Sequence, residues 1–412
     1  MIKHWQNNRN YKKIFLSFLL VLIFPLLFAG NALAQSKIFD KWIEEIRLDA
    51  LARGIKSETL DKAFAGIEPL NAVTELDRQQ PEFRQAFWGY LNARVTPTRI
   101  EQGRAYLKEH KKILKTVGKT YGVQPHFLVA IWGVESNYGA IKGNYPLVGA
   151  LATLAFDGRR AAFFRRQLLD LLQMMDEGHI QSDATGSWAG AMGHTQFMPE
   201  TYRKHAVDFD KDGRKDLWGS LADVFASSAN YLALSGWEKE KGWGREVLLP
   251  DGFDYALCDL NIKKTLSEWR NLGVRTARGG RLPQGKTEAS LILPGGADGG
   301  PALLVYQNFR VLLEWNRSIL YAVVVGHLAD RITGAPALQT PGNFLAALSL
   351  AETIELQQLL ACWGYYQGEI DGIAGTKTRE AIRIFQQENV MPADGFPSLK
   401  TLKYLRLKSN QI

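Results

Sequence analysis

Apolar residues recur at helical spacing through much of the first half of the chain. Within residues 99–114, Tyr106 and Leu107 recur seven positions later as Ile113 and Leu114, two helical turns on, which is the spacing of an amphipathic helix. Pro125 then stands where another helix would begin, because proline is tolerated in a first turn. A third apolar stripe follows within residues 163–172. The pattern predicts a mainly helical region over residues 39–172.

Further along the chain the pattern becomes more varied. Small residues dominate residues 186–199, which indicates a loop that enters a helix, and residues 208–217 suggest an acidic turn. Apolar spacing predicts helices again over residues 224–234 and 316–332. Two short apolar runs around a proline- and glycine-rich stretch predict a small hairpin within residues 289–305. The expected fold class is therefore mainly α, in an α+β arrangement with one small β element.

A linker is expected near the end of the chain. Residues 334–348 contain Pro336, Pro341 and two glycines, which disfavour regular structure. A separate C-terminal domain is therefore predicted over residues 349–412. Two apolar helix faces support this prediction, formed by Leu356, Leu359 and Leu360 and by Ala381, Ile382 and Phe385. The unit is expected to be a small three-helix module.

The first residues have the pattern of a secretory signal. Lys12 and Lys13 precede an apolar run over residues 14–29, and Ala32 and Ala34 form a small-x-small cleavage site. Cleavage after Ala34 would make residues 1–34 a signal peptide and place the mature protein in the periplasm. The alternative is an uncleaved membrane anchor, for which the apolar run is short. No cysteine lies beside the cleavage site, so the sequence gives no support for lipid attachment there.

Charge and cysteine content limit which partners and which disulfide the sequence supports. The chain of 412 residues has a formal net charge of +8, but residues 1–34 contribute four positive charges and no acid. The rest holds 46 basic and 42 acidic residues without a concentrated basic stripe. This balance argues against nucleic acid as a partner, and no motif indicates a nucleotide. The two cysteines, Cys258 and Cys362, fall in different predicted domains, and two such distant thiols are more often unpaired.

One carboxylate stands out in an apolar helical segment. Glu135 follows Ile131, Trp132 and Val134, and Gly133 and Gly139 leave room for the backbone beside it. Burial disfavours the charged form of a carboxyl group, so such a glutamate is expected to hold its proton near neutral pH. A general acid that protonates a glycosidic oxygen needs this property. The alternative is a partly exposed or paired glutamate with no catalytic role.

The acidic turn has the spacing of an EF-hand loop. Carboxylates occupy loop positions one, three, five and nine, with glycine at position six, and these residues are Asp208, Asp210, Asp212, Asp216 and Gly213. Crowded carboxylates repel one another unless a cation compensates them. Position twelve, however, is Gly219 instead of glutamate. The alternative is a solvated acidic turn without an ion.

The segment around Glu135 resembles the catalytic motif of the lytic murein transglycosylase B family, which has a lysozyme-like core. Several further segments, in the same order, resemble other motifs of that family and extend the likeness over residues 39–332. These segments are Gln80 to Phe83, Ala150 to Asp157 with Arg159 and Arg160, Ser187 to Pro199, Ala229 to Leu232, and Asn316 to Ala322. Such a series is far more specific than any single motif.

The resemblance implies roles for particular residues of a catalytic domain over residues 35–333. Glu135 would be the acid and base. Groove residues that contact substrate would be Ser187, Gln196, Tyr231, Tyr321, Asn316, Arg159 and Arg160. The family's EF-hand-like loop is longer, so Asp223 would supply the missing ligand and Arg214 its carbonyl to a structural calcium ion. No cofactor is expected in catalysis.

The implied reaction is cleavage of the β-1,4 bond from N-acetylmuramic acid to N-acetylglucosamine in peptidoglycan, with formation of 1,6-anhydro ends. The C-terminal unit resembles the peptidoglycan-binding module of wall hydrolases. Expected partners are peptidoglycan glycan strands and other cell-wall enzymes. Two alternatives stay open at this point: a muramidase that uses water, and a wall-binding scaffold without activity. Exo or endo cleavage and the preferred stem peptide do not follow from the sequence.

Overall fold

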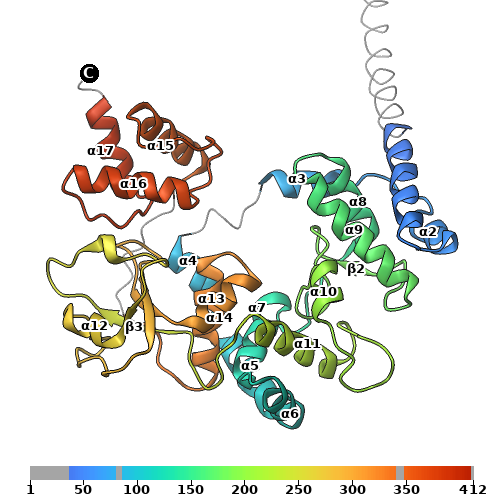
Figure 1. Ribbon diagram of the computed structural model, residues 1–412, viewed down its shortest axis with the longest axis horizontal. Coiled ribbons are helices and arrows are strands. Elements are labelled where there is room, and N and C mark those ends of the chain that lie inside the picture. The colour runs from blue at the N-terminus through green and yellow to red at the C-terminus, as the bar shows by residue number, and fades with distance from the viewer. Residues whose placement is uncertain (1–36, 80–85, 340–347, 410–412) are drawn as a thin grey trace, which may run out of the picture. The chain divides into compact units, whose positions relative to one another are not determined.

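A computed structural model describes residues 37–79, 86–339 and 348–409 (Figure 1). The expected signal peptide, the segment from Gln80 to Phe83 and much of the expected linker lie outside these residues. The described chain divides into two compact units. Unit 1 comprises the described residues up to 78 together with residues 143–192 and 197–204, and unit 2 comprises the remainder.

Unit 1 is helical. Residues 37–52 form its first helix, and α8 packs against α9, whose apolar stripe is the one predicted within residues 163–172. A two-stranded antiparallel pair, β1 with β2, closes the loop that follows α9. The elements are α2 (Ser57–Ala63), α3 (Asn71–Gln79), β1 (Tyr145–Pro146), α8 (Leu147–Phe156), α9 (Ala161–Asp176), β2 (Thr185–Gly186) and α10 (Pro199–His205).

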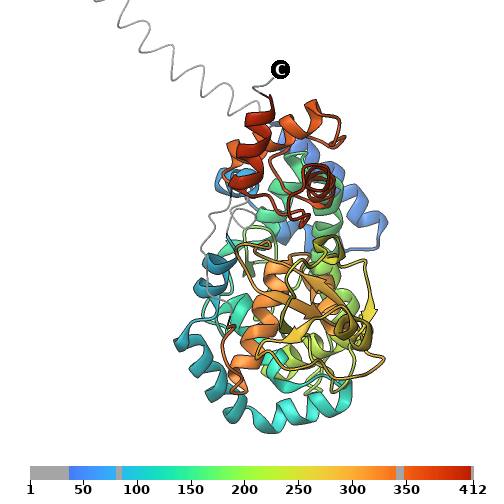
Figure 2. The same cartoon turned by 90° about the vertical axis from the view of Figure 1, so that its left-hand side faces the viewer.

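The helical part of unit 2 is built around α7 and α14, which pack against each other (Figures 1 and 2). Both helices are buried on almost all sides, so their apolar residues do not form a single stripe. Helices α4, α5 and α13 pack on α14, and α6 packs on α11. The bounds are α4 (Phe87–Arg94), α5 (Pro97–Glu109), α6 (Lys111–Tyr121), α7 (Pro125–Ser136), α11 (Leu221–Leu234), α13 (Gln307–Trp315) and α14 (Ile319–Ile332).

A five-stranded antiparallel sheet forms the β part of unit 2, in the order β4-β6-β7-β3-β5. The predicted hairpin is confirmed as β6 with β7, but the other three strands were missed. Trp269 is fully buried in the apolar cluster beside the sheet, and its indole N–H donates to the carbonyl of Ala289. The elements are β3 (Gly244–Leu248), η2 (Tyr255–Leu257), β4 (Lys264–Thr265), α12 (Leu266–Asn271), β5 (Arg275–Thr276), β6 (Glu288–Ile292) and β7 (Ala302–Val305).

Three helices make up the C-terminal part of unit 2, as predicted: α15 (Leu350–Cys362), α16 (Thr376–Glu388) and α17 (Leu399–Ser409). Their apolar faces meet in a small core that includes Leu356, Ile382, Phe385 and Leu402. Gln357 is fully buried there, and its amide binds Asp371 and Gly372 of the bend between α15 and α16. Mainly helical structure with small sheets is thus confirmed.

Both cysteines are free: Cys258 is buried and Cys362 is exposed. Within the described ranges, no helix is both long and apolar enough to cross a membrane.

Candidate active site

Helix α7 carries Glu135 in its last turn. Pro125 begins the helix, and the chain leaves it through three successive left-handed residues, Asn137, Tyr138 and Gly139, with φ of 50°, 59° and 84°. A Cβ on Gly133 would lie 2.6 Å from the ring of Tyr138, and one on Gly139 would lie 2.2 Å from the ring of His194. The two glycines therefore make room for two aromatic rings, which is more specific than the expected room for backbone.

Two side-chain donors bind one oxygen of Glu135. The Tyr321 hydroxyl donates to Oε1 at 2.5 Å, and the Trp315 indole N–H donates to the same Oε1 at 2.8 Å. Burial raises the pKa of Tyr321 well above its ordinary value, and the charge of Glu135 adds to the shift, so the phenol stays protonated and remains a donor. Glu135 is only partly buried. Besides the apolar neighbours expected from the sequence, two polar donors from distant residues therefore contact the carboxylate.

The turn between α13 and α14 positions both donors. Trp315 ends α13, and Asn316 follows in extended conformation, with its Oδ1 accepting the backbone N–H of Ser318 at 3.2 Å. Ser318 caps α14 and accepts the N–H of Tyr321. The turn therefore places two partners of Glu135, Trp315 and Tyr321, three residues before and three residues after the Ser318 cap.

Tyr231 supports this group from α11. Its ring meets the Trp315 indole edge-on, with centroids 5.0 Å apart and an angle of 71°. Its hydroxyl donates to the backbone carbonyl of Glu314 at 2.8 Å. Of the predicted groove residues, the structure thus brings Tyr231 and Tyr321 into the surroundings of Glu135. Trp315 was missed, although it directly precedes the segment quoted from Asn316 onward.

His194 contacts α7 through Trp132 and Ser136. Its Nδ1 accepts the indole N–H of Trp132 at 2.7 Å, and its Nε2 lies 3.0 Å from the carbonyl of Trp218. Because Nδ1 accepts, Nε2 must carry the hydrogen that binds this carbonyl. Burial lowers the pKa of His194, and the charge of Lys142 lowers it further, so the neutral ring is favoured. The Ser136 hydroxyl also donates to the carbonyl of His194, at 2.6 Å.

Gln196 ties its own loop in unit 2. Its side-chain amide donates to the carbonyls of Gly193 at 2.9 Å and Lys142 at 3.2 Å, and its φ is 52°. This arrangement agrees with a structural role for Gln196. A contact with substrate stays a prediction.

The other three predicted groove residues belong to unit 1, where each has a structural partner. The Ser187 hydroxyl accepts the N–H of Ala191 at 2.9 Å. Arg159 binds the carboxylate of Asp77 at 2.7 Å, and Arg160 binds its second oxygen. Burial alone would raise the pKa of Asp77, but the hydrogen bonds from both arginines lower it below its ordinary value. Asp77 is 1% exposed, so the two arginines compensate a buried charge.

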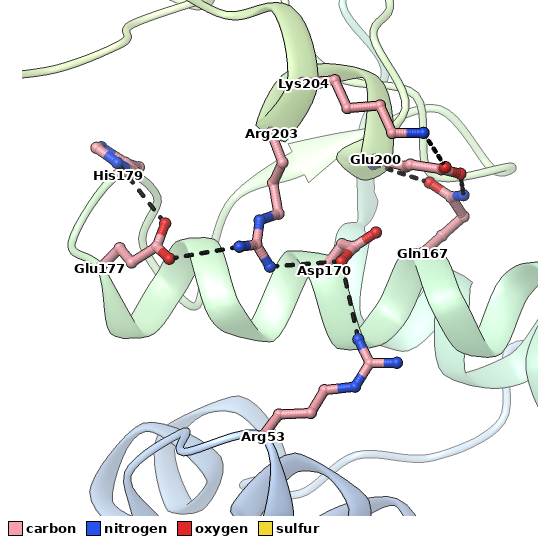
Figure 3. Close-up of polar contacts among 8 residues, drawn as sticks. All are labelled: Arg53, Gln167, Asp170, Glu177, His179, Glu200, Arg203 and Lys204. Atoms are coloured by element: carbon pink, nitrogen blue, oxygen red, sulfur yellow. Dashed lines mark hydrogen bonds and ion pairs between the residues drawn. The ribbon is translucent and has the colours of Figure 1, made fainter.

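An ion-pair network in unit 1 fastens α10 to α9, directly after the loop of small residues (Figure 3). Arg203 lies between Asp170 at 3.5 Å and Glu177 at 3.7 Å, and Arg53 approaches Asp170 at 3.9 Å. The amide of Gln167 donates to the Glu200 carboxylate at 3.1 Å. These contacts fix the C-terminal end of the small-residue loop to a helix.

The acidic loop gathers three of the predicted ligands. Oxygens of Asp208, Asp210 and Asp212 lie within 4.8 Å of one another, a donor set that suits a hard cation such as calcium. The carboxylate of Asp216 instead accepts the N–H groups of Trp218 and Gly219 in its own turn. The backbone N–H of Arg214 donates to Asp212 at 2.8 Å, and a bond from its carbonyl to an ion stays a prediction.

Asp223 organises this loop from α11. It is fully buried and accepts the N–H groups of Phe209 at 2.7 Å and Asp216 at 2.9 Å, one on each oxygen. Burial raises the pKa of Asp223, although these hydrogen bonds oppose the shift. Asp223 was predicted as a metal ligand; its described partners are backbone N–H groups, and its binding of an ion stays a prediction.

Known families match most of the chain. Residues 38–330 match the family described as Transglycosylase SLT domain, and residues 349–405 match a putative peptidoglycan binding domain. Membrane-bound lytic murein transglycosylase B of Escherichia coli (strain K12) is 30% identical over 322 residues, which are 74% of this chain and 84% of that protein.

Solved structures show the same relationship. SltB3 from Pseudomonas aeruginosa, in complex with NAG-anhNAM-pentapeptide, superposes with a TM-score of 0.86 at 48% identity, covering 89% of this chain and 99% of that chain. The Escherichia coli lytic transglycosylase Slt35, in complex with calcium, has a TM-score of 0.59 at 29% identity and covers 72% and 93%. The chain therefore belongs to the transglycosylase SLT domain family and is a lytic transglycosylase with a C-terminal peptidoglycan-binding domain.

Proposed function

We propose that this lytic transglycosylase cleaves the β-1,4 bond from N-acetylmuramic acid to N-acetylglucosamine in peptidoglycan, with Glu135 as both acid and base. The observation that carries the proposal is the carboxylate itself, which stands at the end of a buried helix with Oε1 held by Tyr321 and Trp315. The ligands named for the SltB3 complexes, NAG-anhNAM-pentapeptide and NAG-NAM-pentapeptide, support this substrate class.

The proposed reaction has two proton transfers. Glu135 first protonates the glycosidic oxygen, and the bond from that oxygen to C1 of the muramic acid breaks. The resulting carboxylate then takes the proton of the C6 hydroxyl, whose oxygen attacks C1 and closes the 1,6-anhydro ring. The substrate's own N-acetyl oxygen can stabilise C1 in between, so a second carboxylate is not needed. Proximity favours this internal nucleophile over water, and no water is consumed.

The remaining groove residues would contact the glycan or its peptide stem. Ser187, Gln196 and Asn316 offer polar groups, Tyr231 offers an aromatic face, and the half-exposed arginines offer charge toward an acidic stem. Tyr321 is only 3% exposed, so it would act near the substrate through the hydroxyl that it directs at Glu135. These residues are Ser187, Gln196, Asn316, Tyr231, Tyr321, Arg159 and Arg160. Their structural partners do not prevent a second contact, because side-chain oxygens, amides and guanidinium groups bind more than one partner.

A calcium ion in the acidic loop would have a structural role. Asp208, Asp210 and Asp212 would hold it, with Arg214, Asp216 and Asp223 completing the loop as ligands or as ties. The chemistry of the two proton transfers uses no metal. An exported protein would meet both calcium and peptidoglycan in the periplasm, where other cell-wall enzymes are its proposed partners.

The experiment digests purified sacculi with the wild-type enzyme and with Glu135→Gln, then identifies the muropeptides by mass. We expect anhydro ends from the wild type, each lighter by one water than a hydrolysed end, and no cleavage above background by E135Q. Glu101→Gln, on the exposed face of α5, is the matched control and should keep full activity. Reducing ends that incorporate heavy oxygen from labelled water would identify a muramidase, and an active, folded E135Q would exclude Glu135 as the acid.

A further inference from the structure

The two side chains described as donors to Glu135 bind the same carboxylate oxygen. Tyr321 and Trp315 bind Oε1 at 2.5 and 2.8 Å, and they approach from opposite sides of one short turn. A carboxylate oxygen has two lone pairs. With both lone pairs of Oε1 occupied by donors, a proton can bind there only by displacing one of them.

The two donors differ in how firmly their role is fixed. The indole N–H of Trp315 can only donate, and the buried phenol of Tyr321 stays protonated, so it always has a hydrogen to donate. Trp315 is also held in place by the edge-on ring of Tyr231, whose hydroxyl is bound to the backbone of Glu314. The arrangement therefore keeps one obligatory donor, Trp315, directed at Oε1, with Tyr321 as a second donor beside it.

We propose that Trp315 is a positioning residue that, together with Tyr321, reserves Oε1 as an acceptor and so makes Oε2 the oxygen that gives and takes the catalytic proton. This inference rests on the proposed role of Glu135 as acid and base. It assigns the two oxygens of one carboxylate to separate tasks.

The assignment has a consequence for the acid step. When Oε2 releases its proton to the glycosidic oxygen, negative charge spreads onto Oε1. Hydrogen bonds to an ionised acceptor are stronger than those to a neutral one, so both donors bind more tightly as the charge develops. Interactions that strengthen toward the transition state accelerate the step. Removing a donor should therefore slow the reaction and make Glu135 hold its proton to higher pH.

The test measures kcat/KM on soluble glycan across pH for Trp315→Phe, which keeps an aromatic ring but removes the N–H. Loss of one charge-assisted bond should move the alkaline limb of the profile upward by about one pH unit. The plateau should fall by about tenfold. Tyr321→Phe removes a single oxygen and should shift the limb in the same direction, so the test survives a W315F variant that fails to fold.

Trp237→Phe is the matched control, because it also removes an indole N–H bond within unit 2, here to the side chain of Gln124. The alkaline limb of the W237F profile should fall at the same pH as that of the wild-type enzyme. A W315F profile that is lower at every pH but unshifted would mean ordinary packing, and an unchanged profile would mean no role. Either result overturns the proposal.

An independent readout follows the indole N–H resonances of 15N-tryptophan-labelled enzyme. The Trp315 signal, assigned by its loss in W315F, should titrate with the midpoint of the alkaline limb and should become flat in Glu135→Gln. A Trp315 signal that does not respond in wild-type enzyme overturns the proposal even where E135Q is inactive. An active E135Q instead identifies failure of the proposed acid and base, and with it the inference that depends on it.

Discussion

Two carboxylate sites in unit 2 are organised in opposite ways. At Glu135, one carboxylate receives side-chain donors from Trp315 and Tyr321, which lie 180 and 186 positions away in the chain. In the acidic loop, several carboxylates receive backbone N–H groups from residues two to fourteen positions away. The first arrangement joins distant parts of the chain at one carboxylate, and the second shapes a local turn.

The difference predicts separate responses to substitution. Changes in the acidic loop should lower stability and affect catalysis only indirectly, whereas changes at Glu135 should affect catalysis with little loss of stability. His194 links the two sites, because it accepts from Trp132 on α7 and binds Trp218 at the end of the loop.

The largest stability effect is expected for Asp223→Ala. The substitution leaves buried N–H groups of Phe209 and Asp216 without their acceptor, and the free energy of unfolding should fall by about 3 kcal/mol. Denaturant unfolding measures this change. Asp254→Ala, which removes a single exposed backbone tie, is the control and should cost about 1 kcal/mol. Equal losses in the two variants would contradict a central role for Asp223.

Calcium should stabilise the wild-type protein. An ion that binds only the folded state adds about 2.7 kcal/mol when its free concentration is a hundred times Kd. The melting temperature in excess calcium and in excess chelator measures the effect. Asp210→Asn should reduce the response, since Asp210 is one of the three clustered carboxylates. Identical melting curves with and without calcium would leave the loop as a solvated turn.

A third carboxylate, Asp330, extends the comparison, because its ionisation should make the stability of the fold depend on pH. Asp330 on α14 accepts one indole N–H, from Trp243, and burial raises its pKa to about 6 despite this bond. Because the folded pKa exceeds the unfolded one, stability is fully present below about pH 4 and is lost as pH rises to about 6. The expected loss from this group is about 3 kcal/mol.

Asp330→Asn should remove that component of the pH dependence. The free energy of unfolding of the variant, measured at several pH values from 4 to 7, should fall less steeply than that of the wild type. Parallel curves for the two proteins would show that Asp330 is not the group responsible. The result would also show how much one indole donor compensates a buried charge, compared with the two donors at Glu135.

The smallest stability effect is expected for His194→Phe, about 1 to 2 kcal/mol, because Trp132 and Trp218 each lose one partner. If His194 transmits the state of the loop to α7, the activity of this variant should no longer respond to calcium. His126→Phe, in the first turn of the same helix, is the control and should keep the wild-type response. A calcium response that survives in His194→Phe would mean that the two sites act independently.

The sequence predicted the parts of the fold that have a local signature. Pro125 and the apolar residues after it defined α7, and proline and glycine between two apolar runs defined the β6–β7 hairpin. The other strands of this sheet were not predicted, because β4 and β5 are only two residues long and β3 mixes charged with apolar residues. Short strands are specified by their pairing partners, which a linear pattern does not contain.

The candidate site divides in the same way. The acidic loop could be found from its spacing, since Asp208, Asp210 and Asp212 lie close in sequence and in space. Glu135 could be found through its motif. Its partner Trp315 could not, because no periodicity connects residues on helices that meet only in the folded core. His194 was quoted within a motif, yet its bond to Trp132 becomes visible only in the structure.

The exit from α7 also limits how this enzyme can vary. At Gly139, a side chain would need a left-handed backbone and the space that His194 already fills, so two independent barriers oppose each replacement. Gly133 meets one such barrier, the ring of Tyr138. In a saturation library across residues 133–139, selection for activity should leave these glycines nearly invariant while the partly exposed Val134 drifts. Diversity in substrate preference would then have to arise outside the helix that carries Glu135.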